Sequence, residues 1–352
     1  MSSQPLRVGV VGAGGNSRLR HIPGFRQIEN VEIAGVANRS RESGEAAARE
    51  FGIPKVFDDW QALVADPDID AVCIGTWPNM HCDVTVAALE AGKHVLCEAR
   101  MARDLREARR MMAAAEKHPE LVAQIVPSPF TLGVDDWIAD LLVDEVLGDL
   151  LELRVRFLNG SLRDADAPMN WRINDELSGK NAMVMGILHE AILRWLKLPD
   201  LQLLATAGFG SGARPLEDGA YQDTSIPESL QIVGHPSAGP RLLYDLSQLY
   251  SGPSENSIRI CGALGSIEID LVTKKVTLAI DGKEPEVREI EDAWDVEGEF
   301  VRSIRNGDPV TKTSFADGLE YMAFTEAVWR SWTSGSPAAN TLTSGITGKN
   351  AR

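Results

Sequence analysis

Short, mostly apolar runs separated by stretches with helical spacing fill the first part of the chain. Such runs begin at Leu6, Val31, Ala71 and His94, each leads into a helical stretch, and a fifth begins at Leu121. Strands that are apolar on both faces are typical of parallel sheets, because helices cover both of their faces. The alternation of strands and helices therefore predicts an α/β domain with a doubly wound parallel sheet.

The pattern changes after about Pro127 to a series of strand-like runs joined by turns. These runs include "LLELRVRFLNGSL", "SLQIVGH", "PRLLYDLSQLY" and "SIRICGALGSIEIDL", and helical spacing returns at about 182–196 and 315–332. This order predicts an α+β domain with a large, mostly antiparallel open sheet and helices on one face. We place the two domains at residues 1–126 and 127–352.

Charge and hydropathy exclude two classes of partner. The 352 residues carry a formal charge of −16, whereas nucleic-acid binding requires a basic surface. No apolar run reaches the roughly 18 residues of a membrane span. Residues 1–15 lack the basic segment and cleavage site of a signal peptide. We therefore expect a cytoplasmic protein with neither a nucleic-acid nor a membrane partner.

Cysteine and histidine provide no recognisable metal site. The four cysteines, at 73, 82, 97 and 261, lack C-x-x-C spacing, and no two of the six histidines are four residues apart. This distribution predicts reduced core thiols and no bound metal.

A glycine-rich turn joins the first predicted strand to the first helix. Gly12, Gly14 and Gly15, followed by Asn16, occupy the place of a dinucleotide-binding motif. There the first glycine permits the turn, the second lets the backbone approach the pyrophosphate, and the helix N-terminus faces its charge. Ser17 replaces the third glycine of the motif, so a glycine-rich turn without a ligand is the alternative.

The end of the second predicted strand bears on the choice of cofactor. An acid at this place binds the ribose 2′-hydroxyl of NAD, but here the strand ends in Asn38-Arg39-Ser40. Arg39 and Ser40 could bind a 2′-phosphate, and no carboxylate would repel it. We expect NADP or NAD, with NADP accepted at least as well. The alternative is that the arginine belongs to a solvated helix start.

Further polar residues follow the next two strands. Thr76, Pro78, Asn79 and His81 lie in the stretch "TWPNMH", and Glu98 ends the strand that starts at His94. The carboxyl edge of such a sheet is where the nicotinamide end of a dinucleotide lies. We therefore assign these residues to the cofactor site, while a loop with a helix N-cap is the alternative for residues 76–81.

These motifs together resemble a known family. Gly12-x-Gly14, "TWPNMH" and "AGKHVLCEARMA", followed by "NWRINDELSGKN", "MGILHEAILRWL" and "GALGSIEID", are similar in order and spacing to the glucose–fructose oxidoreductase, inositol dehydrogenase and MocA family. The resemblance covers nearly the whole chain. It implies an NAD(P)-binding Rossmann domain and a second domain for substrate binding. It also implies a homodimer or homotetramer formed through the C-terminal sheet.

The chain departs from that family at its catalytic motifs. The family carries Glu-Lys-Pro where this chain has Glu98-Ala99-Arg100, and the family lysine is thought to contact substrate and help move a proton. The resemblance implies that Glu98 lies near the nicotinamide ribose, and Arg100 could orient substrate. The family motif Asp-x-Gly-x-His-x-x-Asp corresponds to Met185, Ile187, His189 and Ile192 here, so only its histidine remains.

His189 is accordingly our candidate for proton transfer, because a histidine pKa lies near neutrality. Trp171-Arg172 matches a recurrent family pair that could stack on and hydrogen-bond a sugar. Lys180 is the candidate to replace the missing lysine. The plainer alternatives are a histidine packed in the core and a lysine that faces solvent.

The sequence thus predicts an NAD(P)-dependent oxidoreductase that acts on a hydroxyl or carbonyl of a carbohydrate, inositol or related polyol. His189 and Glu98 are the expected catalytic residues. Two alternatives remain open. One is NAD-dependent glycoside cleavage or elimination with transient oxidation, which would give no net NAD(P)H. The other is a catalytically silent cofactor-binding sensor, which would bind cofactor and turn over no substrate.

Overall fold

The structure is a computed structural model that describes residues 4–216 and 218–341. The described residues form two compact units. The Rossmann unit contains those of residues 1–127 together with residues 294–319. The open-sheet unit contains those of residues 128–293 together with those of 320–352, so the division falls within helix α10.

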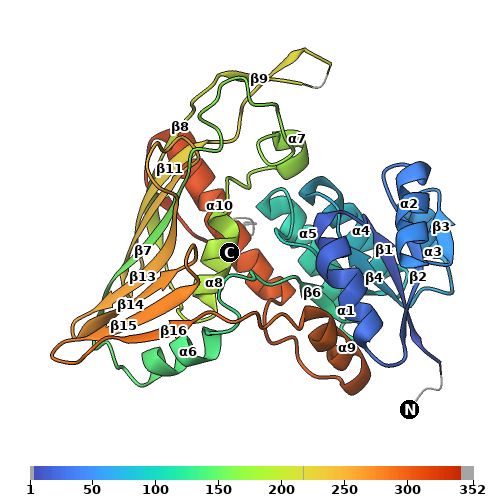
Figure 1. The fold of residues 1–352 in the computed structure, drawn as a ribbon, viewed down its shortest axis with the longest axis horizontal. Coiled ribbons are helices and arrows are strands. Elements are labelled where there is room, and N and C mark those ends of the chain that lie inside the picture. The colour runs from blue at the N-terminus through green and yellow to red at the C-terminus, as the bar shows by residue number, and fades with distance from the viewer. Residues whose placement is uncertain (1–3, 217, 342–352) are drawn as a thin grey trace, which may run out of the picture. The chain divides into compact units, whose positions relative to one another are not determined.

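The Rossmann unit is built on a six-stranded parallel sheet in the order β3-β2-β1-β4-β5-β6. The chain fills one half of the sheet outward from β1 and then the other half outward from β4, so the switch point lies between β1 and β4 (Figure 1). This confirms the predicted doubly wound fold. The strands are β1 (Leu6–Val11), β2 (Val31–Ala37), β3 (Lys55–Phe57), β4 (Ala71–Ile74), β5 (His94–Cys97) and β6 (Ala123–Ile125).

Helices follow most of these strands, and short polar side chains begin several of them. Ser40, Asp59 and Asp104 each accept a hydrogen bond from a backbone N–H of the first turn of the helix that follows. The helices are α1 (Ile22–Gln27), α2 (Arg41–Phe51), α3 (Trp60–Ala65), α4 (Pro78–Glu90) and α5 (Leu105–Lys117), and a π-helical turn, η1 (Ser17–His21), precedes α1.

Helix α9 (Val296–Asn306) was not predicted, and it belongs to the Rossmann unit. Phe300 of α9 is fully buried and packs edge-on against Phe25 of α1, with ring centroids 6.3 Å apart. Arg305 donates to the carbonyl oxygens of Glu29 and Asn30, both at 2.8 Å. Residues 294–319 were expected in the second domain but belong to the first unit. Apolar side chains of this segment complete the core of that unit.

The open-sheet unit contains nine strands in the order β16-β15-β14-β13-β7-β12-β11-β8-β17. The β7–β12 pair is parallel and the other pairs are antiparallel, which confirms the predicted mostly antiparallel sheet. The strands are β7 (Leu150–Leu158), β8 (Gln202–Gly208), β11 (Ser229–His235), β12 (Arg241–Ser247), β13 (Glu255–Gly262), β14 (Gly265–Asp270), β15 (Lys275–Ile280), β16 (Glu286–Glu289) and β17 (Ala338–Ala339). A separate pair joins β9 (Ala213–Pro215) to β10 (Tyr221–Asp223).

Helices lie against one face of this sheet (Figure 1). They include α8 (Met185–Leu193), α10 (Phe315–Ser334) and α6 (Asp135–Val143). The same unit contains the short α7 (Asp175–Ser178). Helix α8 is shorter than the predicted 182–196, because Met183 has a φ of 49° that a right-handed helix cannot contain.

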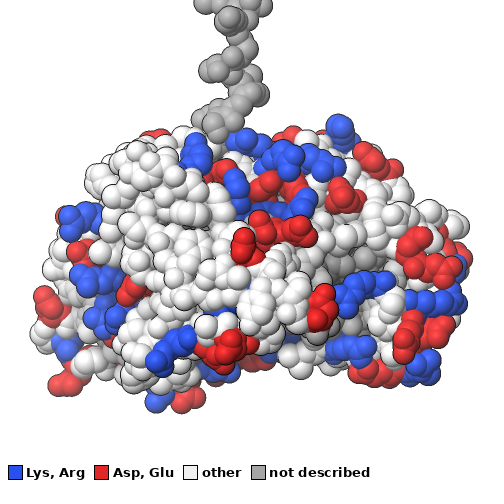
Figure 2. Space-filling view, turned by 90° about the horizontal axis from the view of Figure 1, so that it is seen from above, with Lys and Arg blue, Asp and Glu red and all other residues white. Residues whose placement is uncertain are grey.

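The other face of the sheet carries charged side chains. Arg154 and Arg156 alternate along β7 with the buried Leu153 and Val155. Basic and acidic side chains are also intermingled on the face of the molecule drawn in Figure 2. Among the described residues, no helix is both long enough and apolar enough to cross a membrane.

Candidate active site

The glycine-rich turn after β1 is held tightly against the end of β4. Gly12 has a φ of +86°, and a Cβ there would lie 2.9 Å from the backbone of Gly75. The Ser17 hydroxyl donates to the Gly12 carbonyl oxygen at 2.9 Å, and a Cβ on Gly75 would collide with that hydroxyl. Gly75 has no side chain and therefore leaves room for the Ser17 hydroxyl. Gly75 was not among the site residues predicted from the sequence.

The next two glycines leave room for a ligand. A Cβ on Gly14 would meet the Gly75 carbonyl oxygen at 3.6 Å, an ordinary contact, and a Cβ on Gly15 would have no described neighbour within 4 Å. The first N–H groups of the helix that follows have no acceptor within the helix, so they can bind an anion. The turn therefore fits a dinucleotide pyrophosphate.

The end of β2 touches this turn through a side chain. The Asn38 Oδ1 atom accepts from the Ala13 backbone N–H at 2.7 Å. Ser40 caps α2 by accepting from the Ser43 N–H. Arg39 is exposed, and its guanidinium lies 5.4 Å from the centre of the Trp77 ring. Asn38, Arg39 and Ser40 were expected at the ribose. Of these three, Arg39 has a charged side chain, and it is exposed to solvent.

The stretch after β4 contains two buried oxygen atoms that lack partners. The Thr76 Oγ1 and Asn79 Oδ1 atoms have no hydrogen-bond partner among the described residues. Pro78 is the first residue of α4, where its missing N–H has no cost. Buried polar atoms are normally satisfied, so these two oxygens indicate that a ligand or water completes the site.

His81 ties this stretch to the one after β5. Its Nε2 atom lies 3.0 Å from the Thr76 carbonyl oxygen, and its Nδ1 atom lies 2.9 Å from the Arg100 carbonyl oxygen. Burial lowers the pKa of His81, which favours a neutral ring with a single N–H. Both nitrogens thus face the protein backbone, and His81 holds the site together instead of offering a free nitrogen to the cofactor.

Glu98 follows β5 and is the centre of a charged cluster. Its Oε1 atom accepts from the Asn16 amide and lies 2.9 Å from the His21 Nε2 atom. The other ring nitrogen of His21 lies 2.5 Å from the Glu297 Oε1 atom, and the Trp294 indole N–H donates to Glu297 Oε2 at 2.9 Å. His21 is completely buried, whereas the Glu98 side chain is 15% exposed.

Electrostatics favours the charged forms in this cluster. Burial alone would lower the pKa of His21, but its hydrogen bonds to Glu297 and Glu98 raise that pKa to about 9. Burial would raise the pKa of Glu98, but the hydrogen bond and charge of His21 outweigh it and lower that pKa. At neutral pH the cluster is therefore a buried imidazolium between two carboxylates.

In the stretch that replaces Glu-Lys-Pro, Arg100 is buried, whereas Glu98 and Ala99 are partly buried. The peptide bond between Ala99 and Arg100 is cis. The Ala99 N–H donates to Glu98 Oε2 at 3.1 Å, and the Arg100 residue is 5% exposed. Ala99 therefore contributes a backbone donor to Glu98 and no side-chain charge.

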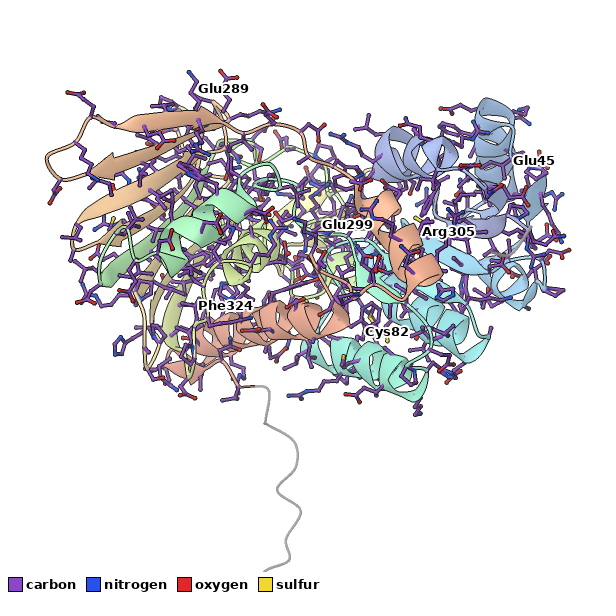
Figure 3. All side chains as sticks on the ribbon, turned by 90° about the horizontal axis from the view of Figure 1, so that it is seen from below. Glu45, Cys82, Glu289, Glu299, Arg305 and Phe324 are labelled. Carbon is purple, nitrogen blue, oxygen red and sulfur yellow. The ribbon has the colours of Figure 1, made fainter. Side chains whose placement is uncertain are left out.

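In the open-sheet unit, His189 of α8 is completely buried in an apolar setting. Its ring stacks on Phe324 of α10 with centroids 3.7 Å apart (Figure 3 labels Phe324). Its Nδ1 atom lies 2.8 Å from the Tyr244 hydroxyl, and its Nε2 atom has no hydrogen-bond partner among the described residues. Burial lowers the pKa of His189 to about 3, so the ring is neutral at pH 7.

The neighbours of His189 on α8 are buried. Met185 and Ile192, at the family's aspartate positions, are 1% and 0% exposed. Glu190 accepts from the Ser128 backbone N–H at 2.8 Å and lies near Arg194. The glutamate beside the histidine is thus part of the packing of α8.

The remaining predicted substrate residues are tied down locally. The Lys180 ammonium donates to the Glu326 carboxylate at 2.6 Å, so it is an ion-paired lysine and not one that faces solvent alone. The Arg172 guanidinium lies over the Trp171 ring at 4.3 Å. Asn174 caps α7.

The structure gathers the predicted cofactor residues at the carboxyl ends of β1, β2, β4 and β5, where His21, Glu297, Trp294 and Gly75 join them. His21 and Glu297 were not among the site residues predicted from the sequence. The sequence does contain one signal for them: His21 and Glu297 lie beside the buried apolar residues of α1 and α9. In the other unit Tyr244 was not predicted either, because it follows the alternation of β12 and so looks like an ordinary core residue.

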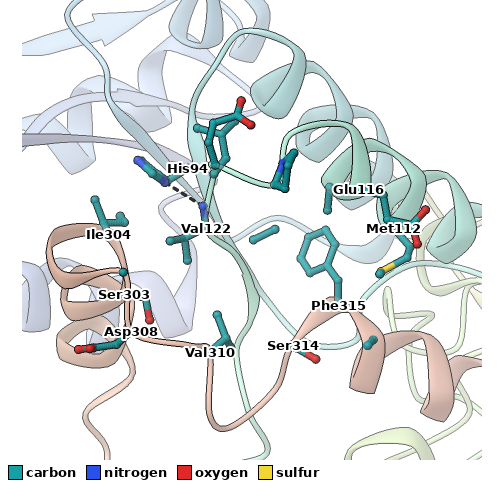
Figure 4. Close-up of a pocket in the computed structure, with 17 residues that line it drawn as sticks. His94, Met112, Glu116, Val122, Ser303, Ile304, Asp308, Val310, Ser314 and Phe315 are labelled. Carbon is teal, nitrogen blue, oxygen red and sulfur yellow. Dashed lines mark hydrogen bonds between the residues drawn. The ribbon is translucent and has the colours of Figure 1, made fainter.

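A separate cavity of about 440 Å³ lies in the Rossmann unit near the beginnings of β5 and β6 (Figure 4). His94, Val122, Ser303 and Phe315 are among its lining residues, and His94 accepts from the Val122 N–H at 2.9 Å. None of the predicted site residues lines it. It is therefore distinct from the cofactor site.

Comparison with known proteins agrees with these features. Residues 6–125 match an oxidoreductase family with an NAD-binding Rossmann fold. A levoglucosan dehydrogenase of Pseudarthrobacter phenanthrenivorans is 30% identical over 149 residues, 42% of this chain and 38% of that protein. A D-glucoside 3-dehydrogenase of Escherichia coli K12 is 31% identical over 189 residues, 52% of this chain and 51% of that protein. The matches thus span 38% and 51% of the lengths of these two relatives.

Solved structures extend the likeness in fold to most of the chain. Levoglucosan dehydrogenase in complex with NADH and L-sorbose has a TM-score of 0.86 at 21% identity, covering 96% of this chain and 99% of that one. An oxidoreductase domain protein from Kribbella flavida gives the same TM-score and identity, covering 96% of this chain and 100% of that one.

Proposed function

Because residues 6–125 belong to the glucose–fructose oxidoreductase, inositol dehydrogenase and MocA family, as the sequence predicts, we propose that this chain is an NAD(P)-dependent oxidoreductase of a carbohydrate, inositol or related polyol. The observation that carries the proposal is the convergence at the carboxyl edge of the parallel sheet. There the open turn at Gly14 and Gly15, the unpartnered oxygens of Thr76 and Asn79, and the carboxylate of Glu98 meet. Relatives named as dehydrogenases of levoglucosan and of glucosides support the class of substrate.

The residues present fit the cofactor. Gly14, Gly15 and the following helix N-terminus would hold its pyrophosphate, and Thr76, Asn79 and Glu98 would bind its nicotinamide end. When bound, NAD(P) donates or accepts the hydride. Arg39 on Trp77 can bind a 2′-phosphate, which supports NADP as well as NAD.

Proton transfer is assigned to the Nε2 atom of His189. In the tautomer whose Nδ1–H donates to the Tyr244 oxygen, Nε2 keeps its lone pair, and Nε2 has no hydrogen-bond partner among the described residues. A base with so low a pKa suffices, because the hydroxyl of an alcohol becomes strongly acidic as its carbon is oxidised. His189 and Glu98 are thus the proposed catalytic residues, with Trp171, Arg172, Lys180 and Arg100 as substrate contacts.

One observation favours the sensor as a second candidate. His189 is stacked on Phe324, and burial is the cause of its lowered pKa. The lysine and aspartates of the family correspond to Ala99, Met185 and Ile192 in this chain. A protein that binds cofactor and turns over no sugar, polyol or glycoside would agree with this arrangement. The two candidates share the cofactor site and differ in turnover.

Gly14→Val tests the shared part of the proposal. Its Cβ would meet only an ordinary contact, so the unit should fold, while the branched side chain fills the space for the pyrophosphate. We expect fluorescence titration to show no NAD(P) binding by Gly14→Val and weakened binding by Gly14→Ala. Binding by Gly14→Val as tight as in the parent would place the cofactor elsewhere. A panel of sugars and polyols with NAD and NADP, followed by absorbance of NAD(P)H, then separates the enzyme from the sensor.

We also propose a homodimer or homotetramer formed through the open face of the nine-stranded sheet. Leu204 of β8 and Val233 of β11 are paired across the strands and are 39% and 52% exposed. An exposed apolar patch on a sheet is a suitable interface. Light scattering should give a dimer or tetramer that Val233→Lys dissociates. The free thiols, of which Cys73, Cys82 and Cys97 are buried, support a cytoplasmic location.

A further inference from the structure

We propose that His21 and Glu297 are positioning residues of the cofactor site, which hold the Glu98 carboxylate ionised and oriented at the carboxyl edge of β5. The proposal rests on the proposed function, because it assumes that Glu98 contacts the cofactor. It assigns a role to α9, the helix that returns to the Rossmann unit from far along the sequence.

The geometry shows a chain of contacts that leads from the site into the core. Glu98 is the exposed end, at 15%, whereas the side chains of His21 and Glu297 are 0% and 3% exposed. The His21 ring lies 2.9 Å from one carboxylate and 2.5 Å from the other. Glu297 is itself fixed by the Trp294 indole N–H at 2.9 Å and packs closely over Gly24 of α1, which has no side chain to displace it.

The two carboxylates on its ring nitrogens favour a charged ring in His21. A neutral imidazole has one N–H and can donate to only one carboxylate, whereas the imidazolium donates to both. A second buried carboxylate near Glu98 would by itself oppose ionisation of Glu98. The imidazolium reverses this effect, and Glu297 in turn keeps the imidazolium charged inside the protein.

Other ionisable groups near the cluster do not supply this charge. Cys73 of β4 lies within the electrostatic reach of both carboxylates, and its buried thiol has a raised pKa, so it stays neutral. His81 of α4 acts on Glu98 electrostatically, but burial lowers its pKa and keeps it neutral as well. Glu98 and Glu297 themselves are acids. The Arg20 guanidinium of η1 lies 5.4 Å from the centre of the Trp294 ring. His21 is the group within hydrogen-bond distance of both carboxylates.

The experiment measures the affinity for NAD(P) from pH 5 to 10 by fluorescence titration, which needs no turnover. In the parent, affinity should stay constant through neutral pH and fall as His21 loses its proton near pH 9. In His21→Asn and Glu297→Gln, Glu98 loses its support and becomes protonated at higher pH. We expect the acid limb of the affinity profile to move to higher pH in both variants, and each unit of upward shift in the Glu98 pKa moves that limb to a proton concentration about tenfold lower.

Two control variants separate positioning from folding. Glu107→Gln removes another buried carboxylate of the Rossmann unit, one that pairs with Arg103 and has no contact with Glu98. It should lower stability and leave the pH profile of the parent unchanged. Glu297→Asp keeps the carboxylate and should restore most of the parent profile.

The outcomes are distinguishable. Shifted profiles in His21→Asn and Glu297→Gln, with an unshifted one in Glu107→Gln, support the proposal. If Glu98→Gln weakens binding but neither of the other two variants shifts the profile, the positioning role is wrong and the proposed function stands. If the parent binds no NAD(P), the proposed function itself fails. Should both variants fail to fold, a parent affinity that stays flat up to pH 10 still overturns the proposal.

Discussion

His21 in the Rossmann unit and His189 in the open-sheet unit are both completely buried, and their pKa values move in opposite directions. Burial lowers both, but two carboxylates raise the pKa of His21 to about 9, while His189 has a tyrosine and a phenylalanine beside it and a pKa of about 3. The difference teaches that burial alone does not fix a histidine's charge; the partners decide it. In the Rossmann unit a charged His21 therefore binds the Glu98 carboxylate, and in the open-sheet unit the His189 ring is neutral.

Replacement of the neutral histidine should have the largest effect. If His189 moves the substrate proton, His189→Ala should lower turnover by roughly 10²–10⁴-fold and leave NAD(P) affinity intact, because general-base help is of that size and the cofactor residues lie in the other unit. Steady-state kinetics and cofactor titration together test this. His235→Ala, which removes an exposed histidine of β11, is the control. Unchanged turnover in His189→Ala would remove the catalytic assignment.

The opposite charges also predict opposite effects of pH on stability. The pKa of His21 is raised in the folded state, so its contribution is complete below about pH 6.5 and is lost as pH rises toward 9. The pKa of His189 is lowered, so its contribution is complete above about pH 6.5 and is lost as pH falls toward 3. Within its window each group should change the free energy of unfolding by about 1.4 kcal/mol per pH unit.

Denaturant unfolding across pH measures these slopes. His21→Asn should flatten the alkaline limb and leave the acid limb, and His189→Gln should do the reverse. Equal slopes in both variants and the parent would show that the two histidines do not differ in charge.

The smallest effect concerns the missing lysine. In Ala99→Lys the new ammonium would enter a partly buried stretch next to the buried Arg100, and the family aspartates correspond to the apolar Met185 and Ile192 in this chain. An unpaired buried charge is costly, so the lysine should lose its proton or disturb binding. We expect turnover on the natural substrate to stay equal or fall. A large gain would mean that the site is an impaired version of the lysine-dependent one.

Much of the fold could be predicted because its signals are local. The apolar runs of β1, β4 and β5 and the alternation along β7 give the two sheets, and the glycine-rich turn gives the cofactor edge. The packing of α9 in the Rossmann unit could not be predicted, because helical spacing does not indicate which of two cores a helix packs against. Glu297 and His21, 276 positions apart, meet only through that packing.

The same limit applies to the candidate active site. Glu98, Thr76 and Asn79 follow strand ends, so sequence position alone placed them at one edge. The ion pair of Lys180 with Glu326 and the contact of His189 with Tyr244 join separate elements, and nothing in their local sequence indicates them. Residues whose role depends on a distant partner are therefore the ones that the sequence analysis missed or assigned to solvent.

The most direct test of the account is a ¹⁵N NMR titration of the histidine side chains in the intact protein, with His21→Asn and His189→Gln used for assignment. The account predicts that the His21 ring keeps protons on both nitrogens at pH 8, while the His189 ring keeps a single proton at pH 5. A His21 ring that is neutral at pH 8, or a His189 ring that is doubly protonated at pH 5, would contradict it.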